Sequence, residues 1–126
     1  MRKMFLLFSH QLTQSQIVDA KKSLNIKEFV KLPSQLQNLW SNIPADLKTL
    51  DDYLKPFKVY LSNNASKDDV VLIQGDFGGT YKMVLFCKEN GIISVHSTTK
   101  REVKETLQDN RVIKTSTFEH VLFREY

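Results

Sequence analysis

Cysteine and long apolar runs are both scarce in this chain. The single cysteine, Cys87, excludes an internal disulfide and any zinc site built from several cysteines, and it favours a reducing compartment. The apolar run 4–8 is too short for the core of a secretory signal, and no small-residue cleavage site follows it. No stretch approaches the length of about 18 apolar residues that suggests a membrane span. These absences predict a cytoplasmic protein that has no membrane partner.

Glycine and proline are also few, at 4 and 3 in 126 residues, and 41% of the chain is hydrophobic, as in ordinary folded proteins. A chain of this length buries one core, so we expect a single domain over residues 1–126. The net charge of +4 lies in residues 1–31, where six Lys/Arg face two acidic residues. The excess favours an anionic partner, although a solvated basic face is the alternative. The balanced remainder argues against a binder of long nucleic acids.

The hydrophobic pattern predicts strands alternating with helices. Short apolar runs predict strands over 4–8, 28–32, 70–73 and 92–95. Apolar residues at helical spacing predict helices from Thr13 to Asn25, from Ser34, over 47–61 and from about Thr80 to Asn90. Pro56 is expected to kink or break the third of these. Thr13 with Gln16, and Ser34 with Gln37, have the spacing of capping boxes.

The last quarter of the chain has a different pattern. Segments 101–107 and 111–117 flank Asp109-Asn110, a predicted hairpin turn, and 120–124 is a further candidate strand. The whole pattern predicts an α/β fold, with a mostly parallel sheet covered by helices on both faces and a C-terminal antiparallel hairpin. Such sheets bind ligands at the carboxyl ends of their strands. This rule selects three polar segments, Ser9–Gln11, Gln74–Thr80 and Ser97–Arg101.

The segment Gln74–Thr80 is rich in glycine but has neither the Walker spacing nor the G-x-G-x-x-G fingerprint. Its glycines and the helix N-terminus after it would suit a phosphate or ribose oxygen. The alternative is a plain strand-to-helix turn capped by Asp76 or Thr80. Phe77 interrupts the polar loop and is a candidate for stacking on a base. Trp40 and Cys87 lie on apolar helical stripes and are expected in the core.

Histidine is the most direct candidate for acid–base chemistry. His10 follows the first strand and is a candidate general acid or base, with a polar residue satisfied by the backbone as the alternative. His96 is expected to be structural, and His120, in the tail, is the weakest candidate. No two histidines have metal-ligand spacing, so neither a metal nor another cofactor is expected.

The segment Thr98-Thr99-Lys100-Arg101 combines two hydroxyl groups with two cations. This set suits phosphate, and the arginine suits bidentate contact with it. The alternative is a solvated loop that enters the hairpin.

Four stretches together resemble a small family of type III CRISPR-associated proteins, the family numbered twenty in the Csx series. The stretches are MFLLFSHQLTQSQIVDAKKSLNI, KLPSQLQNLWSNIP, DVVLIQGDFGGTYKMV and STTKREV…FEHVLFREY. They cover nearly the whole chain, and the pairing of LFSHxLTxxQxxDA with VxLIQGDFGxTY carries the resemblance. That family is similar in fold to CARF domains, which are Rossmann-like sensors of cyclic oligoadenylate, and it is associated with ring nuclease activity. The resemblance therefore implies a Rossmann-like, CARF-like three-layer sandwich.

The resemblance implies that the chain cleaves cyclic tetra-adenylate to linear di-adenylate with a 2′,3′-cyclic phosphate, without metal, and so switches off antiviral signalling. It implies a homodimer, since the ligand has twofold symmetry. His10, Arg101, Asp76 and Thr99 are then the expected catalytic residues. The expected ligand-binding residues are Ser9, Gln11, Gln74, Gly75, Phe77, Gly78, Gly79, Thr80, Tyr81, Thr98 and Lys100. The alternative is a non-catalytic sensor or sponge that binds the cyclic nucleotide without cleaving it.

Overall fold

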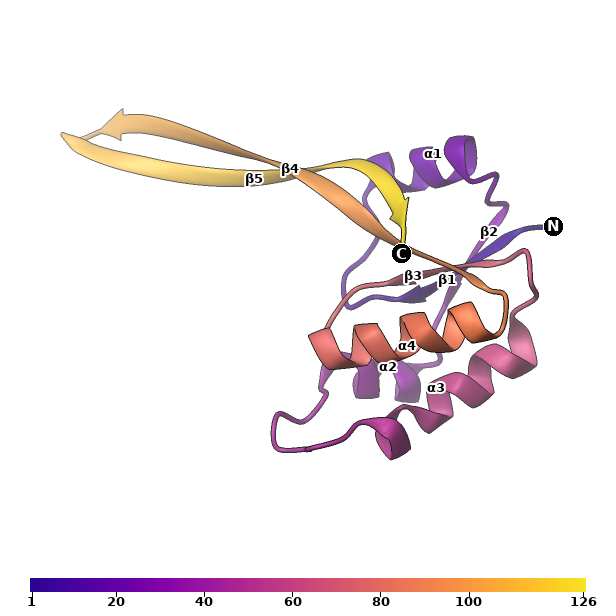
Figure 1. Cartoon of the computed structure of the whole chain (residues 1–126). Helices are drawn as coiled ribbons and strands as arrows, with labels where there is room; N and C mark the ends of the chain where they lie inside the picture. The colour runs from indigo at the N-terminus through magenta and orange to yellow at the C-terminus, as the bar shows by residue number, and fades with distance from the viewer.

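The computed structural model describes all 126 residues and contains one five-stranded sheet (Figure 1). Its strands are β1 (Lys3–Leu7), β2 (Glu28–Lys31), β3 (Val70–Ile73), β4 (Ile93–Gln108) and β5 (Arg111–Glu125), in the order β2-β1-β3-β4-β5. The first four are parallel and β5 is antiparallel to β4. The predicted α/β class, with a mostly parallel sheet and a C-terminal hairpin, is therefore confirmed.

Four helices cover the two faces of the sheet. They are α1 (Gln14–Ser23), α2 (Ser34–Ser41), α3 (Asp51–Asn64) and α4 (Phe77–Glu89). In Figure 1, α1 lies on one side of the sheet and α2, α3 and α4 lie on the other, so the body has three layers. None of the four is long and apolar enough to cross a lipid bilayer.

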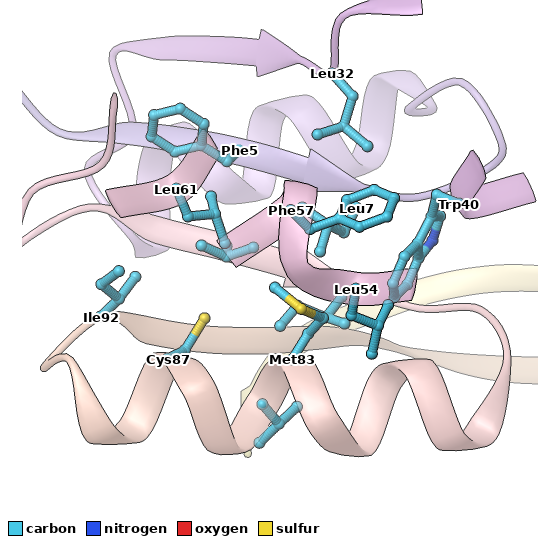
Figure 2. Close-up of a cluster of buried hydrophobic side chains, with 13 residues drawn as sticks. Phe5, Leu7, Leu32, Trp40, Leu54, Phe57, Leu61, Met83, Cys87 and Ile92 are labelled. Carbon is cyan, nitrogen blue, oxygen red and sulfur yellow. The ribbon is translucent and has the colours of Figure 1, made fainter. Parts of the chain in front are cut away.

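The larger core lies between the sheet and the layer of three helices (Figure 2). Strand β3 is buried along its whole length, because helices cover both of its faces. Phe57 and Leu61 of α3 and Met83 of α4 are fully buried against Phe5 and Leu7 of β1. Each such side chain contributes about 1.5–3 kcal/mol of burial free energy. A smaller cluster, which includes Ala20 of α1, fills the other face.

The capping box at the start of α1 is confirmed. The Gln16 amide donates to Thr13 Oγ1 at 3.3 Å, and the Thr13 amide donates to Gln16 Oε1 at 2.9 Å. The capping box expected at Ser34 is wrong. Ser34 is already the first helical residue, and the residue before it is Pro33, which has no side-chain donor or acceptor. Gln37 instead donates its side-chain amide to the Phe8 carbonyl at 3.1 Å.

Two expectations about the later helices are also wrong. Helix α3 begins at Asp51 rather than at 47 and continues through Pro56 without a break. One proline within the first two turns removes a single backbone hydrogen bond, which the buried face of α3 outweighs. Helix α4 begins at Phe77 rather than at Thr80, because the Asp76 carboxylate caps it by accepting from the Gly79 amide at 2.9 Å.

The C-terminal region is one long hairpin and not a short hairpin followed by a separate strand. Residues 93–108 form a single strand, β4, so Ser97–Arg101 lie within a strand and not in a loop. The turn at Asp109-Asn110 is confirmed, and both residues have positive φ angles, 52° and 61°. Figure 1 shows the far part of this hairpin extending away from the layered body.

Candidate functional site

The strand order reverses its direction between β1 and β3. The chain passes from β1 to β2 on one side and returns to β3 on the other, and the Gln74 amide donates to the Leu7 carbonyl at 3.0 Å where the two strands end. The loops that follow β1 and β3 therefore diverge to opposite faces of the sheet. In open α/β sheets this is the position where a crevice forms and ligands bind.

Two neighbouring cavities lie on either side of the loop after β1. The first, the β2 cleft, has a volume of about 430 Å³. It is lined by Leu6, Phe8, Ser9, His10, Gln11, Leu12, Ile17, Phe29, Lys31 and Gln37. The second, the hairpin cleft, has a volume of about 460 Å³. It is lined by Phe8, His10, Gln11, Thr13, Ser15, Gln16, Thr99, Phe118, Glu119 and His120. His10 and Gln11 belong to both, so this loop is the shared wall of the two clefts.

The loop after β1 is held at its base and free at its tip. Gln37 of α2 donates to the Phe8 carbonyl, and Ser9 Oγ lies 3.1 Å from Ser41 Oγ. The His10 ring stands edge-on to Phe8, with the ring centroids 5.4 Å apart, and its side chain is exposed to solvent. A histidine that is positioned by an aromatic contact and open to the cleft is available for proton transfer.

A row of buried, hydrogen-bonded polar side chains forms the floor of the hairpin cleft, where the β4–β5 hairpin meets α1. His120 Nε2 lies 2.8 Å from Asp19 Oδ2, and His120 Nδ1 lies 2.5 Å from Ser97 Oγ. Gln16 Nε2 also donates to Ser97 Oγ at 3.3 Å. The His120 side chain is only 3% exposed, so both of its nitrogens are fully engaged within the protein.

Asp19 is the charged end of this chain. Burial raises the pKa of its carboxyl group, but hydrogen bonds from Ser23 and His120, with the nearby positive charges, outweigh burial and hold the pKa below its usual value. Asp19 is therefore an anion at neutral pH. A neutral His120 would donate from Nε2 to this carboxylate and accept the Ser97 hydroxyl proton at Nδ1.

Sequence reasoning missed this group. His120 had been the weakest histidine candidate, yet it lines the same cleft as His10. In the sequence, His120 is 101 residues from Asp19 and 23 residues from Ser97, so no local motif predicts these contacts. The only hint is the alternation of β4, which places Ser97 and Thr99 on one face.

Gln74 joins neighbouring structural elements, and its oxygen atoms are engaged within the protein and not free for a ligand. Its side-chain Oε1 accepts from the Ser97 amide at 2.8 Å, and its carbonyl accepts from the Trp40 indole at 3.1 Å. The end of β3 is thereby joined to β4 on one side and to α2 on the other. The expectation that Trp40 is a core residue is confirmed, since it is 2% exposed.

The glycines after Gln74 are explained by close packing. A Cβ on Gly75 would lie 3.0 Å from Trp40 Nε1, and one on Gly79 would lie 2.8 Å from Ile43 Cδ1. The Gly79 amide is already bonded to Asp76, and the Thr80 hydroxyl oxygen is buried. The corner is thus a capped turn, the alternative that the sequence left open, and it is more closed to an anion than the phosphate hypothesis expects.

The outer part of the glycine corner faces a third cavity of about 380 Å³ beside the loop before α3. Asp76, Gly78 and Tyr81 line it, and Phe77 lies beside it with 94% of its surface exposed. His10 is not among its lining residues. The structure therefore does not bring two of the expected catalytic residues, His10 and Asp76, into one cavity.

The residues of the third polar segment, Ser97–Arg101, lie in three different surroundings, because the segment is part of a strand. Thr99 lines the hairpin cleft with His10 and His120. The Thr98 hydroxyl is paired with the backbone of Leu122, at 3.1 Å to its carbonyl and 3.2 Å to its amide. Lys100 and Arg101 are exposed further along the hairpin, where Arg101 Nη2 donates to Ser116 Oγ at 3.2 Å.

The remaining candidates are structural. Burial raises the pKa of the Cys87 thiol to about 12, so this thiol is protonated and inert at neutral pH. Burial lowers the pKa of His96, with Arg124 acting in the same direction, and its ring packs against Tyr126. No three His, Cys, Asp or Glu side chains converge in an arrangement that would hold a metal ion.

The strand order and the position of the clefts define the class: a doubly wound α/β protein with candidate binding clefts at the carboxyl ends of its strands. Within that class, the chain belongs to the family described as the uncharacterized protein MJ1673 family, whose model matches residues 2–124. A Methanocaldococcus jannaschii protein, described as uncharacterized protein MJ1673, is 53% identical over 126 residues, covering all of this chain and 98% of that protein. No solved structure matches the chain.

Proposed function

We propose that this protein is a CARF-like ring nuclease that binds cyclic tetra-adenylate and cleaves it to linear di-adenylate ending in a 2′,3′-cyclic phosphate. The observation that carries the proposal is the pair of clefts at the strand reversal, with His10 in the wall between them. The resemblance of LFSHxLTxxQxxDA and VxLIQGDFGxTY to the ring nuclease family is the second support. In a cell the reaction would end type III CRISPR signalling.

The two clefts suit neighbouring nucleotides of one ring. Each has the volume of a small-ligand pocket, roughly 300–1,000 Å³. Phe8 and Phe29 offer apolar surface to an adenine in the β2 cleft, and Lys31 offers positive charge to a phosphate. Thr99 and Gln11 offer hydroxyl and amide groups in the hairpin cleft. A phosphodiester that joined the two bound nucleotides would lie against His10.

The proposed reaction uses the nucleotide's own 2′-hydroxyl group. The 2′-oxygen attacks the adjacent phosphorus, the bond from phosphorus to the 5′-oxygen of the next nucleotide breaks, and the new ends are a 2′,3′-cyclic phosphate and a 5′-hydroxyl. The first cleavage opens the ring, and a second at the opposite phosphodiester gives two molecules of di-adenylate. His10 would accept the 2′-hydroxyl proton or protonate the departing 5′-oxygen. Thr99 would hold the ribose in line for attack, and most of the rate enhancement would come from such positioning.

The charge that develops on phosphorus needs positive groups near the cleft. Lys31 lines the β2 cleft, and Arg101 lies two residues beyond Thr99 on the same face of β4, so these two cations are the proposed source of this charge. Lys100 is on the opposite face of the strand from Thr99. Asp76 caps α4 and lines a different cavity, so the proposed mechanism gives it no proton-transfer step. His120 would act indirectly, because it fixes Ser97 and the strand that carries Thr99.

Incubation with labelled cyclic tetra-adenylate in EDTA, followed by chromatography, tests the proposal. Di-adenylate that ends in a cyclic phosphate is the expected product. If the ligand stays intact and bound to the protein, the protein is a sensor or sponge and not an enzyme. If the ligand does not bind, the proposal is overturned altogether. His10→Ala is the informative variant, and His96→Ala, which changes a histidine outside the clefts, is its matched control.

A further inference from the structure

One exposed aromatic side chain of the hairpin cleft has no role in the proposed reaction. Phe118 of β5 lines this cleft, and 67% of its surface is open to solvent. Its neighbours along the strand are polar, since it follows Thr115-Ser116-Thr117 and precedes Glu119. A phenylalanine that is exposed at the wall of a cavity has a ring face available to a flat ligand.

Strand pairing places Phe118 on the cleft side of the hairpin. Its cross-strand partner is Arg101, and the pair nearer the layered body is Thr99 with His120. Side chains two residues apart on a strand share a face, so Phe118 and Arg101 continue the face that carries Thr99. Glu119 lies between Phe118 and His120, so the same alternation places its carboxylate on the opposite face. At the cleft, the hairpin therefore presents an aromatic ring beside a guanidinium group.

Both of these side chains come from an anchored part of the hairpin. His120, two residues from Phe118 on β5, lies 2.8 Å from the Asp19 carboxylate of α1. Arg101 Nη2 donates to Ser116 Oγ at 3.2 Å, and this bond uses one of the five N–H donors of the guanidinium group. Groups that are already held in place lose less conformational entropy when a ligand binds.

The other aromatic rings of the chain are less suited to a ligand of this cleft. Phe8 also lines it, but Phe8 is half-buried and its ring stands edge-on to His10. Phe77, the residue expected from the sequence to stack on a base, lies beside the third cavity, which His10 does not line. Phe118 is therefore the mostly exposed phenylalanine in the same cleft as the proposed proton-transfer residue.

We infer that a nucleobase stacks on Phe118 in the hairpin cleft and that Arg101 binds the phosphate of the same nucleotide. Aromatic faces bind bases by stacking, and the arginine fork suits phosphate oxygens. Direct cross-strand neighbours have Cβ atoms about 5 Å apart, so one nucleotide can contact both side chains. The subsite rests on the proposed function, which makes adenine the expected base, and it moves the stacking role from Phe77 to Phe118.

Titration with adenosine 5′-monophosphate, followed by NMR, tests the stacking contact without reference to cleavage. Phe118→Ala is expected to weaken binding roughly 5- to 100-fold, as for the loss of one stacked base, and Phe118→Trp is expected to retain it. Leu107→Ala, an exposed apolar position further along the same face, is the matched control and should bind as the wild type does. A loss with Phe77→Ala and none with Phe118→Ala would overturn the inference, as would absence of binding at millimolar ligand.

Ribose 5-phosphate, which has no base, separates stacking from a structural role. Phe118→Ala should bind this probe as well as the wild type does, whereas a distorted cleft would lose affinity for both probes. Arg101→Gln should weaken binding of both probes by about tenfold, because each carries the phosphate. Lys104→Gln, on the opposite face of β4, is its control. Equal losses for the Arg101 and Lys104 variants would overturn the phosphate contact.

Cyclic tetra-adenylate distinguishes failure of the subsite from failure of the proposed activity. Phe118→Ala should raise the Kd for the ring and leave single-turnover cleavage at saturation nearly unchanged, which is the reverse of the effect expected for His10→Ala. If the wild type cleaves the ring and Phe118→Ala binds it equally well, the subsite is overturned and the activity stands. If the mononucleotide binds through Phe118 but the ring does not bind, the subsite stands and the proposed activity is overturned.

Discussion

His120 Nε2 of β5 lies 2.8 Å from Asp19 Oδ2 of α1, so a helix near the start of the chain holds a strand near its end. The contact fixes the base of the β4–β5 hairpin to the layered body. It also closes the floor of the hairpin cleft, since Ser97 and Gln16 continue the same buried chain of hydrogen bonds.

Removal of the contact should destabilise the fold. Asp19→Asn weakens the charge-assisted bond, and His120→Ala leaves two partners unsatisfied, so we expect a loss of about 1–3 kcal/mol for the histidine change and less for the aspartate change. In a domain of this size the larger loss corresponds to a fall in Tm of roughly 4–12 °C. Thermal denaturation followed by circular dichroism measures it. Asp46→Asn, at an exposed position, is the control and should change the Tm little.

The same contact predicts an acid-sensitive stability. The folded-state pKa of Asp19 is held below its ordinary value of 3.8. Its stabilising contribution is therefore fully present above the ordinary value and is lost as the pH falls through the lower folded-state value. Urea midpoints measured between neutral pH and strong acid should show the wild type losing its advantage over Asp19→Asn in that window. A difference that stayed constant down to the lowest pH would contradict the assigned pKa direction.

The two glycines at the start of α4 should respond differently to alanine. A Cβ at Gly79 would meet Ile43 Cδ1 at 2.8 Å, so Gly79→Ala should destabilise the protein by about 1–3 kcal/mol. At Gly78 the nearest atom is Leu50 Cδ1 at 3.3 Å, and helix propensity favours alanine by up to about 1 kcal/mol. Chemical denaturation of both variants should place Gly78→Ala at or near the wild type. Shortening Ile43 to valine in the Gly79→Ala background should recover part of the loss.

Cys87 should be inert in the native protein. Its thiol is buried, and burial raises its pKa to about 12, so almost no thiolate exists at neutral pH. Ellman's reagent should react with fewer than about one molecule in a hundred in the time that a denatured sample reacts completely. Rapid labelling of the folded protein would show that the region around α4 opens far more often than its packing suggests.

His10 should affect turnover more than binding if it transfers a proton. Loss of a general acid or base lowers kcat by about 100-fold or more, while the ligand keeps its other contacts. His10→Ala should therefore leave the Kd for cyclic tetra-adenylate nearly unchanged and slow single-turnover cleavage strongly. Equal losses in binding and cleavage would make His10 a binding group.

Local sequence signals predicted the elements of the fold, and their failures have physical causes. The apolar run Val70–Ile73 and the Thr13–Gln16 capping box depend on adjacent residues, and both were correctly read. The starts of α3 and α4 were misplaced because tertiary packing and an aspartate cap outweigh apolar periodicity. The continuity of β4 was missed, since the polar residues between the predicted strands 92–95 and 101–107 indicate a loop when cross-strand pairing cannot be seen.

The site was predictable at the level of strand ends but not at the level of its groups. The rule for open sheets found Ser9–Gln11 and Thr99, which do line the clefts. The rule did not find Asp19 and His120, because only the folded chain brings them together. The composition of the glycine corner left a phosphate cradle and a capped turn as alternatives, and the two other polar strand ends with the family resemblance favoured the cradle. In the structure, packing against Trp40 and Ile43 explains two of its glycines.

Trp40 gives the protein an optical probe of its own. It is the one tryptophan in the chain, its ring packs edge-on to Phe57, and its indole donates to the Gln74 carbonyl where β3 ends. Indole emission depends on hydration and on that hydrogen bond, so any rearrangement of the strand end should change the wavelength or intensity of the emission. Fluorescence titration of the unlabelled, unmodified protein can therefore report whether a ligand disturbs this corner.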